Sequence, residues 1–475
     1  MCIRDRNNGY DKYTLYAKVG DAWVKLDEGT PTSDPYTITI SIGPGRKIQV
    51  GNYKVPENEI KLFGLNVKRG NKESGIAAVP LLYACEPTGG EVRSSAAATG
   101  NFLFICSNDG YLYAYEIGES TMVYLDARLV VEPSTSYKLN TMSPTLDGID
   151  ATKTAVYVAG GQQVYRFVFN ASTKRFVDEY KSSSPFGGGI QTSPLVIDDY
   201  VIVGEVKDTN SAIHVLYKDD LIHAISYPTL NGLGIASSPV ASGTYVFVPT
   251  AKKVQKENGY DIISQLFVLN TDGFSFKYIN LGYSYYRGES GSDVPIVSSA
   301  AIHGNILYLG TRNGEIIKVD FSNGMTSPST NSKHLTLGRI DASPIVDSDG
   351  NIYIGTDGGY VVKLDSSLNI IWKFYTGNDI RGNDRDAVRS TPLLANDGTL
   401  YVGTYEGYLY ALNKDDGTVK WRYQTGDRIW SSPTLIRGKL IFGSHDKNVY
   451  MLKASGELAP GWTKWRKDLE NTARK

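Results

Sequence analysis

A repeated motif is the feature that most constrains what this chain can fold into. A Ser-Ser-Pro sequence, in some copies with one residue exchanged, recurs eight times. The Pro, or the Ala that replaces it, stands at Ala96, Pro144, Pro194, Pro239, Ala300, Pro344, Pro392 and Pro433. The spacings are 48, 50, 45, 61, 44, 48 and 41 residues. A chain of 475 residues holds either several domains or one large repetitive domain, and the repeat favours the second.

The periodicity within one repeat is that of β-strands. Over Thr399–Asn413, apolar residues alternate through LYVGT and YLYAL, and a Glu406-Gly407 turn separates the two runs. Equivalent turns occur at Asp109-Gly110, Asn313-Gly314 and Asp357-Gly358. Such pairs tolerate the positive φ that tight hairpins demand. Each repeat therefore predicts four short strands, and four strands at a period of this length are typical of a β-propeller blade.

We therefore predict an all-β fold: an eight-bladed β-propeller of four-stranded antiparallel blades over residues 79–456, preceded by a small β-sandwich-like domain. The alternation of Tyr36–Ile42 and a Gly20-Asp21 turn indicate that this small antiparallel β domain, resembling an immunoglobulin-like sandwich, spans residues 8–67. Three further segments complete the predicted organisation: an artefact or disordered stretch at 1–7, a linker at 68–78 and a C-terminal tail at 457–475.

Closure of the ring needs a strand from each end of the repeat region. We predict that Pro80–Glu86 supplies the outer strand of the eighth blade, whose other three strands come from the C-terminal end. Closure of this kind removes the open sheet edges that promote aggregation. The alternative is closure by Gly461–Arg466.

The repeated residues resemble the pyrroloquinoline-quinone-like (PQQ-like) repeat. Ala411-Leu412-Asn413 is followed by Asp416-Gly417 and Trp421, and the chain has no Trp-Asp dipeptide of the WD40 kind. The resemblance covers about Pro80–Lys453 and implies an eight-bladed propeller. It is closer to the non-catalytic outer-membrane-assembly lipoproteins than to the quinoprotein dehydrogenases. The sequence GWTKWRKDLENT, from Gly461, resembles a segment that often flanks such repeats.

The resemblance raises the question of a quinone cofactor. In the quinoprotein dehydrogenases, the quinone lies between a Trp and a disulfide of two adjacent cysteines, beside a Ca²⁺ ion. The three cysteines Cys2, Cys85 and Cys106 are not adjacent, and we place only Trp430 near the axis of the ring. We therefore expect no catalytic residues, no metal and no cofactor, PQQ included.

Two other groups of residues have the composition of a catalytic or metal site. Ser444-His445-Asp446 contains the residue types of a catalytic triad, but consecutive residues cannot converge, so we expect a turn. The five histidines lack HExxH spacing. A hairpin could place His214 and His223 on one face of a blade, and we expect two structural histidines there.

Charge and hydropathy exclude several partners. The 49 Lys and Arg residues against 50 Asp and Glu residues give a net charge of −1, which argues against nucleic acid. The apolar stretch Gly75–Cys85 is too short to span a membrane. The sequence opens without the apolar region of a signal peptide. The family resemblance nevertheless implies an exported protein, periplasmic, cell-surface or secreted.

The candidate binding face lies in the loops that precede the Ser-Ser-Pro strands. Their charged and aromatic residues are Arg93, Asp293, Asp341, Asp386, Arg389, Arg428 and Trp430. Converging donors and acceptors at one end of a ring are what a binding site needs. The alternative is that these side chains pair with one another on the rim. Tyr285 and Tyr286, in a long insertion, suit a sugar ring or a protein partner, or pack on the rim.

We therefore expect a non-catalytic propeller that acts as a protein-interaction or ligand-binding scaffold. The alternative is a glycan-binding or glycan-processing surface protein, which the tyrosine-rich surface would favour. A quinone-dependent dehydrogenase comes third, since it needs an adjacent cysteine pair.

Overall fold

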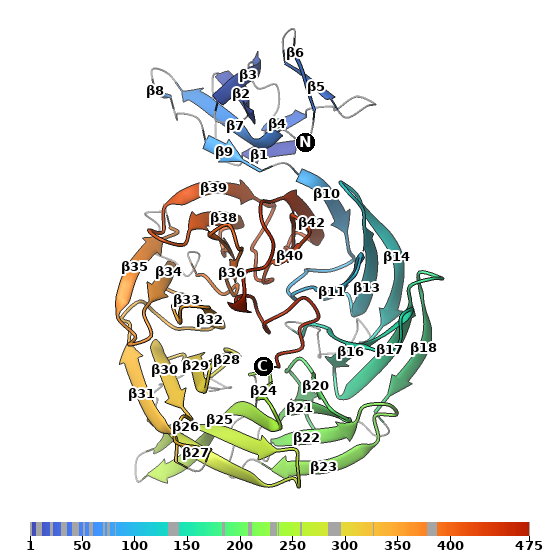
Figure 1. Cartoon of the computed structure of the whole chain (residues 1–475), viewed down its shortest axis with the longest axis vertical. Coiled ribbons are helices and arrows are strands. Elements are labelled where there is room, and N and C mark those ends of the chain that lie inside the picture. Colours follow the sequence, from blue (N-terminus) through green and yellow to red (C-terminus); the bar gives the residue numbers. More distant parts are fainter. Residues whose placement is uncertain are drawn as a thin grey trace.

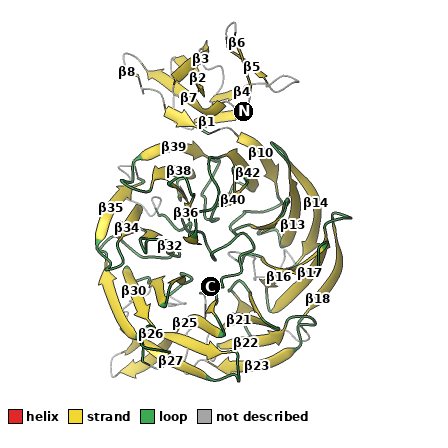
Figure 2. Cartoon of the chain, viewed as in Figure 1, coloured by secondary structure: helices red, strands yellow, loops and turns green. Residues whose placement is uncertain are grey.

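The protein was analysed as a computed structural model. It describes residue 80 and residues 82–474, apart from 132–141, 183–185, 208–210, 229–234, 236, 257–258, 284–295, 326 and 378–386. Before residue 80 it describes the backbone of strands β1–β9. Strands and loops make up the described part of the chain, which contains no helix (Figure 2). Accordingly, the described residues include no helix able to cross a membrane.

Eight antiparallel sheets are arranged in a ring around a central axis (Figure 1). Each blade has four strands, ordered from the axis outwards. Blades 1 to 4 contain β11 (Ala97–Thr99), β12 (Phe102–Cys106), β13 (Tyr111–Ile117) and β14 (Met122–Leu129); β15 (Thr145–Gly148), β16 (Lys153–Gly160), β17 (Gln163–Asn170) and β18 (Arg175–Lys181); β20 (Leu195–Ile197), β21 (Tyr200–Val206), β22 (Ala212–Tyr217) and β23 (His223–Pro228); and β24 (Val240–Ser242), β25 (Tyr245–Lys256), β26 (Gly259–Asn270) and β27 (Phe276–Tyr283).

Blades 5 to 8 follow the same order. They contain β28 (Ala301–His303), β29 (Ile306–Gly310), β30 (Glu315–Asp320) and β31 (Ser329–His334); β32 (Ile345–Asp347), β33 (Ile352–Gly355), β34 (Tyr360–Leu364) and β35 (Ile370–Tyr375); β36 (Leu393–Leu394), β37 (Thr399–Gly403), β38 (Tyr408–Asn413) and β39 (Val419–Gln424); and β40 (Thr434–Ile436), β41 (Lys439–Gly443), β42 (Asn448–Lys453) and β10 (Leu82–Pro87). Two short strands are added to this pattern: β19 (Gly189–Ile190) pairs with β21, and β43 (Gly461–Trp462) pairs with β32.

The position of a strand in its blade determines its hydrophobic pattern. The second strand of blade 7, β37, is buried at every residue, because neighbouring blades cover both of its faces. The outer strand β39 has only Trp421 and Tyr423 buried, because its other face meets solvent. This is why the inner strands are continuously apolar while the outer strands alternate.

The Ser-Ser-Pro motif joins each blade to the next. The backbone N–H of the second residue of the motif donates to the hydroxyl of the same residue in the following blade, at 2.7–3.2 Å. The pairs are Ser95–Ser143, Ser143–Ser193, Ser193–Ser238, Ser299–Ser343, Ser343–Thr391, Thr391–Ser432 and Ser432–Ser95. Between blades 4 and 5, the Ser237 hydroxyl donates to the Ser298 carbonyl instead, at 2.7 Å. The motif that marks the repeat therefore closes a ring of hydrogen bonds around the axis.

Other repeated residues pack one blade on another. Gly443 ends β41, and a Cβ placed there would lie 2.2 Å from Val92 of the next blade. Trp372, in the outer strand of blade 6, donates its indole N–H to the Lys414 carbonyl in blade 7 at 3.0 Å. Its ring lies against Gly417, where a Cβ would come within 2.8 Å. The Gly and Trp of the PQQ-like pattern thus recur because adjacent blades approach closely at these points.

The predicted closure of the ring is confirmed. Strand β10 pairs antiparallel with β42 and becomes the outer strand of blade 8. The alternative closure by Gly461–Arg466 is wrong. Strand β43 instead pairs with β32, the innermost strand of blade 6, and the C-terminal trace crosses the middle of the ring (Figure 1).

Nine strands precede the ring. They are β1 (Cys2–Asp5), β2 (Lys12–Val19), β3 (Ala22–Gly29), β4 (Tyr36–Thr39), β5 (Lys47–Val50), β6 (Tyr53–Pro56), β7 (Ile60–Arg69), β8 (Lys72–Glu73) and β9 (Ala77–Val79). The hairpin predicted from the Gly20-Asp21 turn is the β2–β3 pair. The range predicted as a linker, 68–78, contains β8. The predicted sandwich depends on side chains outside the described residues and stays a prediction.

Candidate binding site at the mouth of the ring

Two positions in a blade lie at one end of the ring, which we call the mouth. The first position precedes the Ser-Ser-Pro motif, and the second lies in the turn between the second and third strands. Both positions in blades 6 to 8 and 1, and the second position in blade 5, carry polar or aromatic side chains that contact one another. We call this set the mouth arc: Arg312, Asp341, Asp357, Arg389, Tyr405, Trp430, His445, Arg93 and Asn108, with Glu91, Arg339 and Arg428 beside them.

Arg389 is the central cation of the mouth arc. Its Nε and Nη2 atoms donate to the two oxygens of Asp357 at 2.9 and 2.8 Å, and its Nη1 atom donates to the Tyr405 hydroxyl at 2.8 Å. Asp341 lies 3.7 Å away and also binds Arg312. Burial alone would lower the pKa of Arg389, but the bonds to Asp357 and the charge of Asp341 raise it above its ordinary value. A two-pronged pair of this kind fixes the direction of the guanidinium.

Three guanidinium groups lie over two aromatic rings. Arg93 and Arg389 lie 4.6 and 5.4 Å from the centre of the Trp430 ring. Arg428 and Arg389 lie 4.6 and 4.9 Å from the centre of the Tyr405 ring. The two rings meet edge to face at 5.4 Å. Cation–π contacts of this kind hold charged side chains in place without neutralising them.

The end of the arc at blades 8 and 1 contains buried polar atoms without partners. Glu91 accepts bonds from Arg93 at 2.7 Å and from Asn108 at 3.2 Å. His445 is buried beside Trp430, and burial, followed by the charge of Arg93, lowers the pKa of His445 to about 4. This imidazole is therefore neutral at pH 7. Its Nε2 atom and the Oδ1 atom of Asn108 have no hydrogen-bond partner among the described residues.

Five of the predicted binding-face residues are described, and the structure brings them together. These are Arg93, Asp341, Arg389, Arg428 and Trp430. Four others, Asp293, Asp386, Tyr285 and Tyr286, lie outside the described residues. Rim pairing, the stated alternative, is also present, since Arg93, Asp341 and Arg389 have charged partners. That the arc binds a ligand stays a prediction.

Sequence reasoning missed the side chains contributed by the hairpin turns. Tyr405, Asp357 and His445 each occupy the position that follows the Ser or Thr at the end of a second strand. The positive φ of each hairpin belongs to a later residue, Gly359, Gly407 or Lys447, and the turn is recognised from that residue type. The side chains that reach the mouth come earlier in the turn. The prediction that only Trp430 lies near the axis is wrong: Trp462 pairs with the innermost strand of blade 6 and is buried.

The described residues do not provide the groups that would hold a quinone in the manner of the dehydrogenases. The sequence has no adjacent cysteine pair, and Arg93 and Arg389 both lie against the Trp430 ring. No group of three His, Cys, Asp or Glu residues in the described ranges could hold a metal ion. That the protein binds no cofactor or metal and is not an enzyme stays a prediction.

The two other sequence motifs have structural roles. Ser444-His445-Asp446 forms the predicted turn, in which the Asp446 carboxylate accepts bonds from Gly426 N–H and the Tyr450 hydroxyl, both at 2.6 Å. His214 and His223 do share one face of blade 3, where both rings lie 2.7 Å from the Ser226 hydroxyl.

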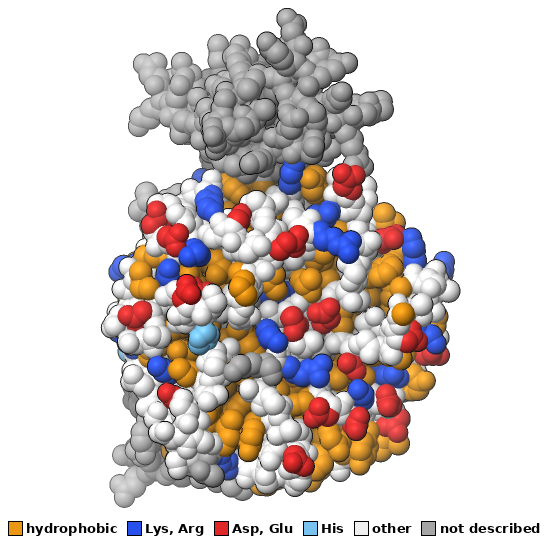
Figure 3. All heavy atoms as spheres, in the orientation of Figure 1, with side chains coloured by type: hydrophobic (Ala, Val, Ile, Leu, Met, Phe, Trp, Pro, Cys, Tyr) orange, Lys and Arg blue, Asp and Glu red, His pale blue; other side chains and the backbone are white. Residues whose placement is uncertain are grey.

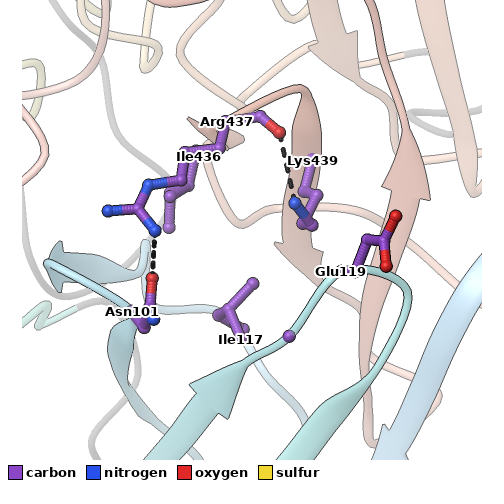
Figure 4. Close-up of a pocket in the computed structure, with 7 residues that line it drawn as sticks. Asn101, Ile117, Glu119, Ile436, Arg437 and Lys439 are labelled. Atoms are coloured by element: carbon purple, nitrogen blue, oxygen red, sulfur yellow. Dashed lines mark hydrogen bonds between the residues drawn. The ribbon is translucent and has the colours of Figure 1, made fainter.

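A shallow pocket of about 200 Å³ lies between blades 1 and 8 (Figure 4). It is lined by turns at the opposite end of the strands from the mouth, with Asn101, Ile117, Gly118, Glu119, Ile436, Arg437 and Lys439. Arg437 donates to the Asn101 side chain, and Lys439 donates to the Arg437 carbonyl at 3.3 Å. The first bond joins the blade 8 wall of the pocket to the blade 1 wall, and the residues that line the pocket include none of the mouth arc.

A known family model matches the C-terminal part of the chain. Residues 357–473 match the family model described as outer membrane protein assembly factor BamB. This stretch carries the PQQ-like repeat. The resemblance found in the sequence is therefore confirmed there, and the matched residues include most of the mouth arc in blades 6 to 8. A search of curated proteins finds no match to the sequence.

Solved structures share the propeller fold. BamB from Moraxella catarrhalis aligns with a TM-score of 0.55 and 16% identity, over 79% of this chain and 100% of that chain. A europium-containing methanol dehydrogenase aligns with a TM-score of 0.58 and 12% identity, over 82% and 87%. Quinohemoprotein alcohol dehydrogenase from Comamonas testosteroni gives 0.57 and 11%, over 80% and 77%. At these identities the likeness shows the fold alone, which an assembly factor and enzymes share.

Proposed function

We propose that this protein is a non-catalytic, exported scaffold that binds a protein partner through the mouth arc. The observation that carries the proposal is Arg428. Its side chain is exposed and lies over Tyr405, and it forms no ion pair with any described residue. An arginine held in place by an aromatic ring, with its charge free, is suited to bind a carboxylate of a partner.

The composition of the arc supports a protein partner. Arg, Trp and Tyr are the residues most enriched among those that dominate protein–protein binding energy. Because the arc is held by Asp357, Glu91 and the ring of Ser-Ser-Pro bonds, little order has to be gained on binding. The match to a family described as an outer membrane protein assembly factor supports export.

The charge distribution favours local recognition over long-range attraction. Figure 3 shows basic and acidic side chains interspersed over the viewed face, with no broad area of one sign. This fits the net charge of −1 and gives no support to nucleic acid. The glycan alternative depends on Tyr285 and Tyr286, which lie outside the described residues, and the comparisons give it no support.

Site-specific photo-cross-linking tests the proposal. A photoreactive amino acid at Asp427, exposed next to Arg428, should cross-link to one discrete protein in the native host. The same probe at Tyr375, exposed on the outer strand of blade 6, should not. The purified partner should then bind Arg428→Ala about tenfold more weakly or worse, since an arginine of this kind contributes about 2 kcal/mol.

A matched control separates this result from a general loss of positive charge. Arg422 also lies 4.6 Å from the centre of a tyrosine ring, that of Tyr408, but it belongs to the outer strand of blade 7. Arg422→Ala should change the affinity less than twofold. Equal losses in the two variants, or cross-linking at both probe positions, would contradict the proposal.

A further inference from the structure

Residues 457–474, which we call the axial segment, run through the ring at the end opposite the mouth. The segment follows β42 and bonds to the innermost strands of several blades. Thr463 accepts from Leu394 N–H of blade 7 at 2.8 Å, and Trp462 pairs with Val346 of blade 6. Three further carbonyls of the segment accept at 2.7–2.9 Å from blades 1, 2 and 4, through Ala98, Leu146 and Ala241 N–H. One short peptide therefore touches at least five blades.

Two buried side chains of the segment satisfy backbone carbonyls at the axis. Arg466 donates to the Ser193 and Pro194 carbonyls of blade 3 at 3.2 and 2.6 Å. Asn471 donates to the Pro144 carbonyl of blade 2 at 2.9 Å and to the Ala96 carbonyl of blade 1 at 3.3 Å. An innermost strand has no neighbour on its axial edge, so its carbonyls need donors from elsewhere. Arg466 and Asn471 supply them, and the Thr145 and Thr434 hydroxyls also donate to the Pro194 and Ala96 carbonyls, at 2.7 and 2.9 Å.

The segment buries two basic side chains to make these contacts. Arg466 and Lys464 are 1% and 0% exposed, and neither forms an ion pair with a described residue. Burial lowers the pKa of Lys464 to about 7 and that of Arg466 to about 9, with Asp468 opposing both shifts. Burial of a cation is costly unless hydrogen bonds compensate. The carbonyls of the ring and Asn471 provide that compensation.

The backbone of the segment adopts a conformation that a free peptide rarely visits. Arg466, Lys467, Asn471 and Ala473 have φ between 54° and 73°, in the left-handed region. A non-glycine residue in this region is unfavourable unless its surroundings hold it there. The contacts with the ring therefore impose this shape on the segment.

We propose that the axial edges of the innermost strands form a peptide-binding site, which the chain's own axial segment occupies in cis. The ligand class is a peptide that presents buried aromatic rings together with the hydrogen-bond donors of arginine and asparagine. Recognition rests on the non-covalent contacts above, so the covalent link through Ser455 and Gly456 is dispensable once the ring has folded.

Cleavage after folding tests this directly. A recognition sequence for a specific protease is inserted between Ser455 and Gly456, in a loop away from the mouth. The intact chain folds first and is then cut at this site. The cut segment should remain with the ring through gel filtration. A fluorescent synthetic peptide of residues 457–475 should then displace it with saturable binding.

Peptide variants distinguish specific recognition of the axial segment from nonspecific binding to the ring. Arg466→Ala and Asn471→Ala peptides should bind about tenfold more weakly or worse, since the first loses the donor to the buried Ser193 carbonyl and the second loses the donor to the buried Pro144 carbonyl. Lys467→Asn is the matched control, because Lys467 is partly exposed, makes no side-chain hydrogen bond in the described structure, and asparagine tolerates its φ of 73°. It should bind within twofold of the parent peptide.

Three results would overturn the proposal. The first is immediate loss of the cut segment with no rebinding of the peptide. The second is equal binding by the parent and Arg466→Ala peptides. The third applies if the synthetic peptide never displaces the cut segment. Chains that carry Arg466→Ala are then folded and cut in the same way and exposed to urea. The proposal fails if the mutant segment is retained by the ring as completely as the parent segment.

Discussion

Removal of one hydroxyl from the ring of Ser-Ser-Pro bonds should lower stability measurably. Ser193 is 1% exposed, and its hydroxyl accepts the Ser143 backbone N–H at 2.8 Å. Ser193→Ala leaves this N–H buried, because Ser143 is equally buried. A buried donor that loses its acceptor costs about 1–3 kcal/mol. We expect the free energy of unfolding to fall by this amount.

Urea denaturation followed by far-UV circular dichroism measures the effect. The midpoint should fall while the slope m stays unchanged, because the mutation alters neither the ring nor the surface exposed on unfolding. Ser193→Thr should recover most of the loss, since Thr391 fills the same role in blade 7. Ser172→Ala, an exposed serine in blade 2, should leave the midpoint unchanged.

One result would refute this reasoning. If Ser193→Ala and Ser172→Ala have the same urea midpoint, the bond from Ser143 N–H to the Ser193 hydroxyl contributes nothing to stability. A second site adds a test of locality: Ser432, between blades 7 and 8, belongs to a distant junction. The losses from Ser193→Ala and Ser432→Ala should add, as effects at separated sites do. A double mutant no worse than either single mutant would refute the argument that each junction contributes separately.

Two further predictions concern packing and charge. Gly443→Ala should destabilise the ring by more than about 1 kcal/mol, since its Cβ would lie 2.2 Å from Val92, whereas Gly148→Ala, where nothing lies within 4 Å, should have little effect on the urea midpoint. Burial lowers the pKa of Lys464 from 10.5 to about 7. Between pH 7 and 10.5 the unfolded chain therefore binds one proton more than the folded chain, and the free energy of unfolding should rise with pH over this range. Lys464→Met should flatten that rise between pH 7 and 9 in thermal unfolding, and an unchanged slope would contradict the burial of a neutral lysine.

Much of the ring could be predicted from the sequence because its determinants are local. The alternation in Thr399–Asn413 and the Glu406-Gly407 turn define a hairpin without reference to the rest of the chain. The closing strand β10 could be predicted because the sequence before the first Ser-Ser motif repeats the order found in every other blade. Eight copies of one pattern also make a chance match improbable.

The axial segment could not be predicted, because its place depends on groups far apart in the sequence. Arg466 bonds to residues 272 and 273 positions earlier in the chain, and Asn471 bonds to Ala96, 375 positions earlier. No repeat or periodicity marks such contacts. They exist only once eight innermost strands have brought their carbonyls to a common axis.

The two ends of the ring consequently offer different chemistry to a partner. At the end opposite the mouth, Arg466 and Asn471 already occupy the axial carbonyls of blades 1, 2 and 3. At the mouth, Asp357 and Tyr405 orient Arg389, whereas Arg428 is held over an aromatic ring and forms no ion pair with a described residue. A partner at the first end must compete with a peptide built into the chain, whereas a partner at the mouth gains an ion pair without displacing one between described residues. The mouth is therefore where we expect a second protein to bind.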